Sequence, residues 1–598
     1  MPSRRLDKGG RIDRSHALDF SFNGRSLTGF RGDTLASALL ANDVSLVSRS
    51  FKLHRPRGIV GSGAEEPNAI FEVGEDDRYQ PNARATQVEL YAGLVARSTK
   101  GWPSLGFDLA AINNVFSRAF GAGFYYKTFM YPRAWWEHYE RFIRRSAGFA
   151  RAPSAVDPDA YEHVNAHCDV LVAGGGPAGL MAALVAAAAG ARVMIADEQN
   201  EFGGSLLASS ESIDGNPAVD WVGRAVTVLG DNPNVTLLPR STVFGYHDHN
   251  FLTIAERCTD HLDHVGPGQI RERLWRIRAR QVVLAQGAFE RPLAFCNNDR
   301  PGVMTASAVS TYVRRYAVLP GERAVVFTNN DSAYMAAIDL ADAGASVVVV
   351  DSRKGGAGAI GKRAEAAGAS VLAGHLVTDV RGNRRVHGVK VARWDGNPNT
   401  TVDNTIRIDC DLVAMSGGWS PAVHLHSHAG GRNRWDDERL CFVPGDMPQQ
   451  AVSAGAGNGK WSLAECLDDG LAAGREVVAR LDLPVPDVAR PAVEPEVTRP
   501  VEALWRVPAG KDPDRCPKQF LDYQNDTSVA DVRLAVREGY RNVEHVKRYT
   551  ALGFGTDQGK LGNINGMAVL AETLGKPIPE VGTTTFRPAY TPVAFGVG

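Results

Sequence analysis

The sequence of 598 residues has few cysteines, and no two of them are closely spaced. Its seven cysteines stand at positions 168, 258, 296, 410, 441, 466 and 516, and none belongs to a C-x-x-C motif. Zinc sites and iron–sulfur clusters need grouped thiolates, so this spacing excludes a local metal motif of either kind. Scattered cysteines fit a reducing compartment, and we predict a cytoplasmic protein.

The chain also lacks an excess of charge and a long apolar run. Sixty-six Lys and Arg balance 67 Asp and Glu, which argues against nucleic acid or an acidic membrane surface as partner. Residues 1–15 are polar and basic without an apolar core, so we expect no secretory signal. The longest uncharged apolar run, 180–191, is too short to span a bilayer.

Signatures of hydrolytic or metal catalysis are missing as well. The sequence contains no G-x-S-x-G or H-E-x-x-H motif, and its fifteen histidines show no ligand spacing. His424 and His426 are interpreted as polar residues at the end of a strand. No catalytic residue and no metal ligand is predicted.

What the chain does contain is a dinucleotide-binding pattern. A short apolar strand, 170–173, runs into Gly174, Gly176 and Gly179, which fit G-x-G-x-x-G. The first glycine makes the tight turn, the second lets backbone approach a pyrophosphate, and the third lets helix pack on strand. The uncharged, alanine-rich stretch 180–189 predicts a buried helix whose N-terminus faces the phosphates.

A second buried strand, 193–196, follows, and Asp197 comes 23 residues after Gly174. An acid at this distance is where a ribose hydroxyl is bound in such folds. Since strand, turn, helix, strand and acid arrive in order, the sequence predicts a dinucleotide site.

A second nucleotide fold is predicted further along the chain, from strand 324–327, helix 332–343 and strand 345–351. Its loop, 328–333, reads Thr-Asn-Asn-Asp-Ser-Ala in place of the glycines. Side chains would occupy the approach to a pyrophosphate, and Asp331 adds a repelling charge. We expect this fold to have lost nucleotide binding and not to take hydride from free NAD(P)H; a shortened loop holding an adenylate is the alternative.

The two ends of the chain resemble small iron–sulfur modules without their ligands. A hairpin turning at Asn23-Gly24, a helix over 35–41 and the run 54–58 resemble the ferredoxin-like module of flavin dehydrogenase subunits. In the iron-binding versions cysteines follow this run, but residues 59–66 contain none. Helical patterns at 528–538 and 542–549 resemble a helical cluster module. There, Asp522-Tyr-Gln and Asp557-Gln-Gly-Lys-Leu-Gly stand at the two ligand positions, so neither module should hold a cluster.

Aromatic residues are dense between 116 and 142, including Phe124-Tyr-Tyr-Lys-Thr-Phe129 and Trp135-Trp136. Interleaved Lys and Arg would suit nucleobase stacking. Because the overall charge is neutral, packing against the flanking domains or a partner chain is the favoured interpretation.

Together these motifs resemble the alpha subunit of heterotetrameric sarcosine oxidase. The stretches that carry the resemblance are 54–58 with 65–68, 102–104, 120–130, 197–199 with 202–206, 298–304 and 582–588. The resemblance implies an α/β fold with two nested Rossmann-like dinucleotide-binding domains, as in disulfide-reductase-like flavoproteins. It adds an N-terminal ferredoxin-like β-grasp module and a small C-terminal helical module.

We therefore expect seven segments: the ferredoxin-like module (1–84), an aromatic connecting segment (85–165), the first dinucleotide-binding domain (166–310 and 411–482), the inserted second fold (311–410), a Pro-rich linker (483–500) and the helical module with an extended tail (501–598).

The resemblance implies an electron-transfer subunit of a complex that oxidises sarcosine to glycine and forms peroxide. A beta subunit would carry FAD and the amine site, with gamma and delta subunits beside it. FMN would be shared at the interface with beta, and NAD would be held in this chain; FAD in the first fold is the alternative. The NAD-binding residues implied by position are Gly174, Gly176, Ala178, Gly179, Asp197, Glu198, Gln199, Ser205, Val243, Ala456 and Ser462.

One departure concerns the end of the sequence. In the family, the alpha subunit continues into a folate-binding, aminomethyltransferase-like domain where this sequence stops, at Gly598. The sequence is then that of a truncated member, or the folate part is a separate chain. Two other functions stay open: a subunit of a proline, hydroxyproline or opine dehydrogenase, and a non-catalytic scaffold with a structural dinucleotide.

Overall fold

The structure is a computed structural model that describes residues 3–117, 120–124, 127, 131–266, 268–397 and 404–597. The chain divides into two compact units, each assembled from segments distant in sequence. Unit 1 comprises 1–158, 290–418 and 498–584, and unit 2 comprises 159–289, 419–497 and 585–598.

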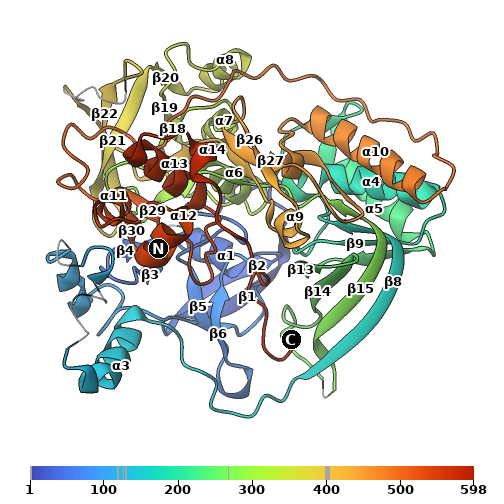
Figure 1. Cartoon of the computed structure of the whole chain (residues 1–598), viewed down its shortest axis with the longest axis horizontal. Coiled ribbons are helices and arrows are strands. Elements are labelled where there is room, and N and C mark those ends of the chain that lie inside the picture. Colours follow the sequence, from blue (N-terminus) through green and yellow to red (C-terminus); the bar gives the residue numbers. More distant parts are fainter. Residues whose placement is uncertain are drawn as a thin grey trace. The chain divides into compact units, whose positions relative to one another are not determined.

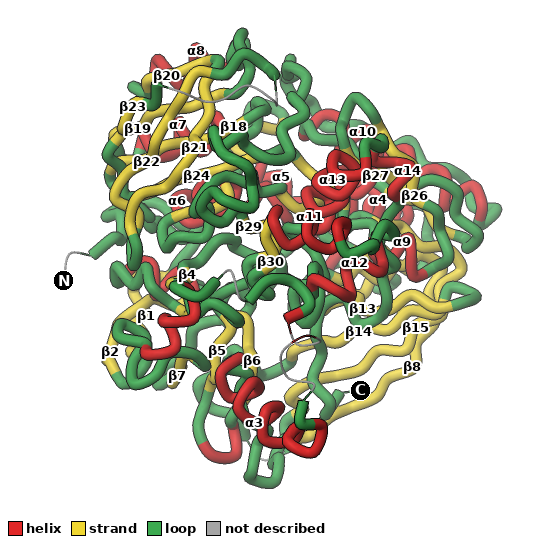
Figure 2. The backbone as a smooth tube through the Cα atoms, turned by 60° about the vertical axis from the view of Figure 1, so that its left-hand side comes forward, coloured by secondary structure: helices red, strands yellow, loops and turns green. Residues whose placement is uncertain are grey.

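Unit 2 is built on a sheet of strand order β12-β9-β8-β15-β14-β13, with β28 also paired to β15. Two of its strands, β8 and β15, are long and pair in parallel over most of their length (Figures 1 and 2). The first part of β15 pairs with β14, and its last residues pair with β28 at the nucleotide fold. The strands of unit 2 are β8 (Ala160–Ala173), β9 (Val193–Ala196), β10 (Ser212–Ile213), β11 (Asn216–Pro217), β12 (Val235–Leu238), β13 (Ser241–His247), β14 (Phe251–Arg257), β15 (Ile270–Leu284), β25 (Trp419–Pro421), β26 (Asn433–Asp436), β27 (Cys441–Pro444) and β28 (Ala451–Ser453), and its helices are α4 (Pro177–Ala188), α5 (Ala218–Gly230), α9 (His424–His428) and α10 (Leu463–Arg480).

Helices α4 and α10 pack closely on each other in unit 2 (Figure 1). Gly470 and Gly474 of α10 face α4, where a Cβ at Gly470 would overlap the backbone of Ala178. The predicted linker has no helix or strand, yet Val488 and Val493 pack against the same core. Up to residue 497, this segment is therefore part of unit 2.

The N-terminal module of unit 1 has the expected hairpin and helix. Its sheet has the order β2-β1-β7-β5-β6. The hairpin turns at Asn23 (φ 52°) and Gly24 (φ 77°), the left-handed conformations that an Asn-Gly turn adopts. Thr34 caps helix α1 with a hydroxyl that accepts from the Ser37 N–H. The elements are β1 (Asp13–Phe22), β2 (Arg25–Arg31), α1 (Leu35–Ala41), β3 (Ser48–Arg49), β4 (Pro56–Arg57), β5 (Ile70–Val73), β6 (Gln80–Arg84), β7 (Val95–Ser98) and, beyond the sheet, α3 (Trp136–Ala147).

The second nucleotide fold has a parallel sheet of order β17-β24-β18-β19-β20. Strands β17 and β24, which the sequence analysis placed in the first domain, pair within this sheet, and residues 290–418 form one segment of unit 1. A short, fully apolar strand fits either parallel sheet, so the sequence could not choose between them. The elements are β17 (Val303–Thr305), α6 (Ala306–Arg314), β18 (Arg323–Thr328), α7 (Tyr334–Asp342), β19 (Ser346–Asp351), α8 (Ala359–Ala366), β20 (Ser370–Ala373), β21 (His375–Gly382), β22 (Val386–Arg393), β23 (Ile406–Ile408) and β24 (Leu412–Ser416).

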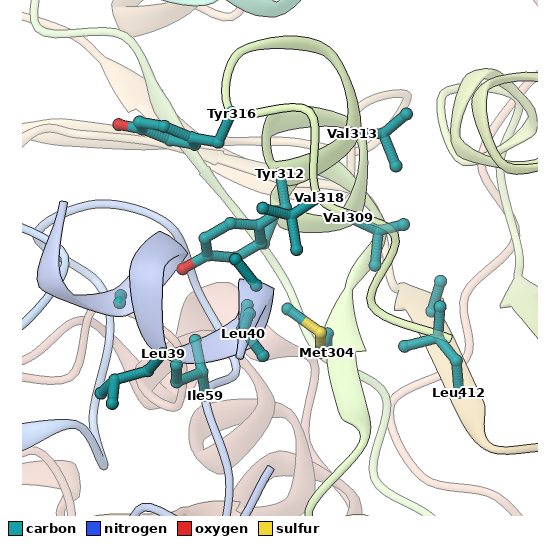
Figure 3. Close-up of a cluster of buried hydrophobic side chains, with 14 of the residues drawn as sticks. Leu39, Leu40, Ile59, Met304, Val309, Tyr312, Val313, Tyr316, Val318 and Leu412 are labelled. Carbon is teal, nitrogen blue, oxygen red and sulfur yellow. The ribbon is translucent and has the colours of Figure 1, made fainter. Parts of the chain in front are cut away.

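One apolar core joins the N-terminal module to this second fold (Figure 3). Leu39 and Leu40 of α1 and Ile59 belong to the same cluster of buried side chains as Met304 and Tyr312. The Tyr312 hydroxyl also donates to the Gly61 carbonyl oxygen at 3.0 Å. The C-terminal module of unit 1 contains β29 (Phe520–Asp522), β30 (Thr527–Ser528), α11 (Val529–Arg537), α12 (Val543–Thr550), α13 (Asn563–Leu574) and α14 (Ile578–Val581).

A buried ionic network, which the sequence alone did not reveal, also holds unit 1 together. Arg55 forms a bidentate pair with Asp299, both bonds being 2.7 Å, and Arg57 contacts Asp299 and Asp526. These residues come from the N-terminal module, the start of the second fold and the C-terminal module. The two arginines hold the pKa of Asp299 far below its usual range despite full burial.

Candidate dinucleotide-binding site

The predicted glycine loop lies between β8 and α4, as the motif requires. Gly174 follows β8 directly with φ 108°, and its N–H donates to the Ala196 carbonyl oxygen at the end of β9. Gly176 is the N-cap of α4 and Pro177 its first residue. The N–H groups of a first helical turn have no partner within the helix, so this end of α4 suits an anionic group.

The three motif glycines are needed for different reasons. A Cβ at Gly174 would overlap the Ala285 carbonyl oxygen, and one at Gly179 would overlap the Gly174 carbonyl oxygen. At Gly176, the single neighbour within 4 Å is the Gly204 Cα, at 3.9 Å. Folding therefore requires glycine at 174 and 179, while the space beside Gly176 is open. Such space is what a pyrophosphate passing close to the backbone needs.

Asp197 lies at the end of β9, but its carboxylate is directed at the loop. One oxygen accepts from the Gly175 N–H at 2.7 Å and the other from the Gln199 N–H at 2.8 Å. The side chain is 8% exposed. Asp197 thus fixes the glycine loop against the second strand.

The other predicted residues lie on several segments of unit 2. The short helix 455–458 reaches the start of α4, since a Cβ at Gly455 would lie 2.6 Å from the Ala178 Cβ. The Ser462 hydroxyl caps α10, accepting from the Glu465 N–H at 3.2 Å. Of the remaining residues, Glu198, Gln199 and Ala456 are half-buried, Ser205 is exposed and Val243 is buried in β13.

The corresponding loop of the second fold is filled by its own side chains. Asn330 and Asp331 are 7% and 5% exposed. Asp331 pairs with Arg353 at 2.8 Å, and Arg353 also pairs with Asp351 at the end of β19, again at 2.8 Å. The acid at the ribose position and the residue at the pyrophosphate position therefore share one internal arginine.

The chain segment 499–502 then covers the ends of β18 and β19. The Arg499 N–H donates to Asp331 at 2.7 Å, and the Glu502 carbonyl oxygen accepts from the Asn329 amide at 2.7 Å. The Arg499 guanidinium donates to the Gly355 carbonyl oxygen at 2.6 Å. In such folds nucleotides bind at the carboxyl ends of the parallel strands, and in the second fold the segment 499–502 occupies that place. A hollow of about 450 Å³ remains beside the segment, lined by Arg353, Lys354, Trp394, Asp395, Gly396 and 500–502.

Glu66 organises the loop of the N-terminal module where cluster ligands would be expected. It is fully buried, and its two oxygens accept four backbone N–H bonds of 2.7–2.9 Å, from Val60, Gly61, Asn68 and Ala69. Burial raises the pKa of Glu66, and the four donors oppose that shift. No sequence pattern indicates this arrangement other than the acid pair at 65 and 66.

Asp522 and Asp557, at the former ligand positions of the C-terminal module, are both buried. Asp522 accepts from the backbone N–H groups of Asn525 and Gly553, each at 2.8 Å. Burial, with the charge of Asp557 nearby, raises the pKa of Asp522 to about 7. Across the described residues, no group of three or more His, Cys, Asp or Glu side chains could hold a metal ion.

The two histidines interpreted as strand-end polar residues lie instead on helix α9, and both are buried. His424 stacks on Tyr590 with ring centroids 4.1 Å apart. Burial lowers the pKa of His426, so this side chain is neutral at physiological pH. Both contribute to packing in unit 2.

Many described residues of the aromatic segment are exposed, whereas Phe124 is buried and Phe120 packs against a buried cluster. Tyr125, Tyr126, Thr128 and Phe129, at the centre of the predicted run, lie outside the described residues. Large apolar side chains around it are exposed: Trp102, Phe107, Ile112, Val115, Phe116, Tyr131, Trp135, Phe142 and Phe149. Packing against flanking domains, one of the two favoured interpretations, does not hold for these residues.

Three family profiles match the chain: "Sarcosine oxidase A3 domain" over residues 516–598, "2Fe-2S iron-sulfur cluster binding domain" over 15–101 and "Pyridine nucleotide-disulphide oxidoreductase" over 168–437. The sarcosine oxidase subunit alpha of Rhizobium meliloti (strain 1021) is 47% identical over 600 residues, covering 100% of this chain and 59% of the relative. The chain is homologous to sarcosine oxidase alpha subunits. The subunit alpha from Corynebacterium sp. (strain U-96) is 40% identical, covering 98% of this chain and 57% of that relative.

The similarity to these subunits agrees with the resemblance inferred from the sequence motifs. The crystal structure of L-proline dehydrogenase from P. horikoshii has the same architecture, with a TM-score of 0.67 and 20% identity over 100% of this chain and 99% of that one. The chain spans less than two thirds of the length of the sarcosine oxidase subunits that it matches. Residues 15–101 match the iron–sulfur profile without containing a cysteine. Within the described part of the chain, no helix is long and apolar enough to cross a membrane.

Proposed function

We propose that this chain is the cofactor-binding, electron-transfer subunit of a sarcosine oxidase complex, which demethylates sarcosine to glycine and forms hydrogen peroxide. Similarity to sarcosine oxidase alpha subunits along the whole chain supports this function. The observation that carries it is the contrast between one open glycine loop and one loop filled by internal ion pairs. A subunit with this pair of loops holds a dinucleotide but has no second site at which free NAD(P)H delivers hydride.

The dinucleotide in the first fold is NAD in this proposal. Gly176 and the first turn of α4 would accommodate the pyrophosphate, and Glu198, at the end of β9, would lie near the adenosine ribose. Asp197 would hold the loop in place. The other expected contacts are Gly174, Ala178, Gly179, Gln199, Ser205, Val243, Ala456 and Ser462.

The flavins of the complex are assigned mainly to its partners. FAD and the amine site would lie in a beta subunit, and FMN would be shared between that subunit and this chain. An iron–sulfur cluster does not fit, because the module matching the cluster profile contains no thiolate and Glu66 already engages its loop N–H groups. Electrons would therefore pass between flavins and to oxygen, not through a cluster; this also disfavours a proline- or opine-type dehydrogenase.

The exposed aromatic segment supports the presence of partner subunits. On α3, Phe142 is 72% exposed, and Trp135, directly before the helix, is 58% exposed. Apolar side chains gathered on one segment of a soluble subunit are typical of a protein interface. We assign the exposed apolar residues of 102–117 and 131–149 to contact with the partner subunits of the complex.

The test is to purify the chain with its partner subunits and to measure peroxide formed from sarcosine and from proline. Denaturing the chain purified alone then releases its nucleotide for mass and absorption analysis. We expect peroxide from sarcosine and NAD in the released fraction. Turnover of proline with an external acceptor would replace the proposed function with the dehydrogenase, and FAD released from this chain would contradict the NAD assignment. A complex that turns over neither amine would indicate a non-catalytic scaffold.

A further inference from the structure

Two cysteines far apart in the sequence form a thiol pair within unit 1. The two thiols lie within interaction range, since each is the largest influence on the pKa of the other. Their backbones are held together beside the pair, where the Asn297 N–H donates to the Lys518 carbonyl oxygen at 2.9 Å. Cys296 lies at the start of the second nucleotide fold, and Cys516 at the entry to the C-terminal module. Both cysteines are free.

The two thiols differ in access to solvent. Cys296 is 2% exposed, whereas Cys516 is half-buried. The Cys516 Sγ lies 3.4 Å from the Pro513 carbonyl oxygen and 3.2 Å from that of Pro517, in the exposed turn 512–517. An oxidant arriving from solvent therefore reaches Cys516 first, because Cys296 is buried.

The pKa shifts of the two thiols also favour Cys516 as the thiol that reacts first. The interaction with the Cys296 thiol lowers the pKa of Cys516, while the interaction with Cys516 and burial raise the pKa of Cys296. The charge of Arg506 also favours the Cys516 thiolate. Because the thiolate is the nucleophile in thiol oxidation, Cys516 is the attacking sulfur and Cys296 the resolving one.

We propose that Cys296 and Cys516 form a dithiol site that hydrogen peroxide oxidises to a disulfide. The Cys516 sulfur attacks one peroxide oxygen and breaks the O–O bond, giving a sulfenic acid and one water. The Cys296 sulfur then attacks the Cys516 sulfur, the S–O bond breaks, and the thiol proton leaves with the hydroxyl group as a second water. Two thiols lose two electrons in total, and one peroxide is reduced to two waters.

This site goes beyond the proposed function, although the two are related. A sarcosine oxidase complex releases peroxide, so the pair would meet an oxidant made by the same assembly. The bond would tie the second fold to the C-terminal module within unit 1. The site itself requires only peroxide, so it can be tested on the chain whether or not the complex oxidises sarcosine.

Cys258 provides an internal comparison because it is also half-buried. Burial raises the pKa of Cys258 to about 11, while that of Cys516 lies below the ordinary thiol value of 9.0. A lower pKa gives a larger thiolate fraction at neutral pH, and this gain exceeds the loss in nucleophilicity of the less basic thiolate. We therefore expect Cys516 to react with peroxide faster than Cys258.

The experiment treats the reduced full-length chain with one to ten equivalents of hydrogen peroxide, blocks the remaining thiols and maps the peptides by mass spectrometry. We expect a Cys296–Cys516 cross-linked peptide, a loss of two of the seven titratable thiols and reversal by dithiothreitol. In Cys296→Ser, oxidation should stop at a sulfenic acid on Cys516 that dimedone traps. In Cys516→Ser, Cys296 should stay reduced.

The matched control is Cys258→Ser, which should form the cross-link at the wild-type rate. Circular dichroism of each serine variant verifies that the fold is intact before oxidation. Oxidation of Cys258 at the same rate as Cys516 would overturn the proposal. So would over-oxidation of Cys516 to sulfinic acid without a cross-link in the wild-type chain.

Discussion

The two nucleotide folds of this chain share a strand–loop–helix arrangement, and they differ in what occupies the loop. Beside Gly176 the nearest protein atom that a Cβ would meet is 3.9 Å away. In the second fold, Asp331 is paired with Arg353 and covered by the backbone of Arg499. A parallel sheet with a following helix is therefore not evidence of a nucleotide site by itself; the space at the middle of the loop decides.

The same contrast extends to the former cluster positions. Glu66 gathers four backbone N–H groups in the N-terminal module, and Asp522 gathers backbone donors in the C-terminal module. In each place an acid side chain satisfies donors that would otherwise be buried without partners, a defect that costs about 1–3 kcal/mol per group. These acids account for the stability of module folds that contain no cluster thiolates.

The largest expected effect comes from closing the open loop. Gly176 has an ordinary extended backbone (φ −75°), so Gly176→Val should fold normally and fill the space of the pyrophosphate. We expect dinucleotide binding to weaken at least ~1,000-fold, measured by calorimetry and by the nucleotide released on denaturation. The matched control is Gly223→Ala in α5, where a Cβ meets no atom within 4 Å and binding should be unchanged.

Substitutions of Glu66 and its neighbour Glu65 test how the N-terminal module is stabilised without a cluster. Glu66→Ala leaves four buried N–H groups without acceptors and should lower the free energy of unfolding by about 3–5 kcal/mol. Glu65→Ala loses two bonds from a half-buried side chain and should cost about 1 kcal/mol. The changes are measured by thermal unfolding. Equal losses of unfolding free energy in the two variants would show that the four bonds of Glu66 do not stabilise the loop more than the two bonds of Glu65.

Opening the filled loop of the second fold should have a smaller effect. Asp331→Ala removes one partner of Arg353, but Asp351 still pairs with that arginine. We expect a loss of about 1–3 kcal/mol in stability and no gain of a second nucleotide, because the segment 499–502 still covers the strand ends. Saturable binding of a second dinucleotide to this variant would show that Asp331 alone closes the site.

The smallest effect is a pH dependence in the C-terminal module. Folding raises the pKa of Asp522 from near 4 to about 7, so between these values the folded chain holds a proton that the unfolded chain has released. Stability is therefore lost as pH rises through this window, by up to ~1.4 kcal/mol per unit. From pH 5 to pH 8 the wild type should lose about 1–3 kcal/mol more than Asp522→Asn in urea unfolding. Parallel pH profiles for the two proteins would contradict the assignment.

The parts of the fold that sequence reasoning captured rest on local patterns. The hairpin at Asn23-Gly24, the capped helix after Thr34 and the glycine loop each depend on residues within a few positions of one another. The resemblance to sarcosine oxidase alpha subunits rested on motifs spread over the chain, and the similarity to those subunits agrees with it.

What escaped prediction depends on contacts between distant segments. The strand β24 reads as apolar in any sheet, so its pairing with β18 was not predictable. The cover over the second loop comes from residues about 170 positions later, and the bond from Arg499 to Asp331 has no local signature. The Arg55–Asp299 pair likewise joins two turns that the sequence analysis used only for the family resemblance.

The most direct test is the number of dinucleotides bound per chain, measured by quantifying the nucleotide released from the wild type and the two loop variants. We predict one per chain in the wild type and in Asp331→Ala, and none in Gly176→Val. Two per chain in the wild type, or retention in Gly176→Val with loss in Asp331→Ala, would contradict the assignment of the open loop as the binding site.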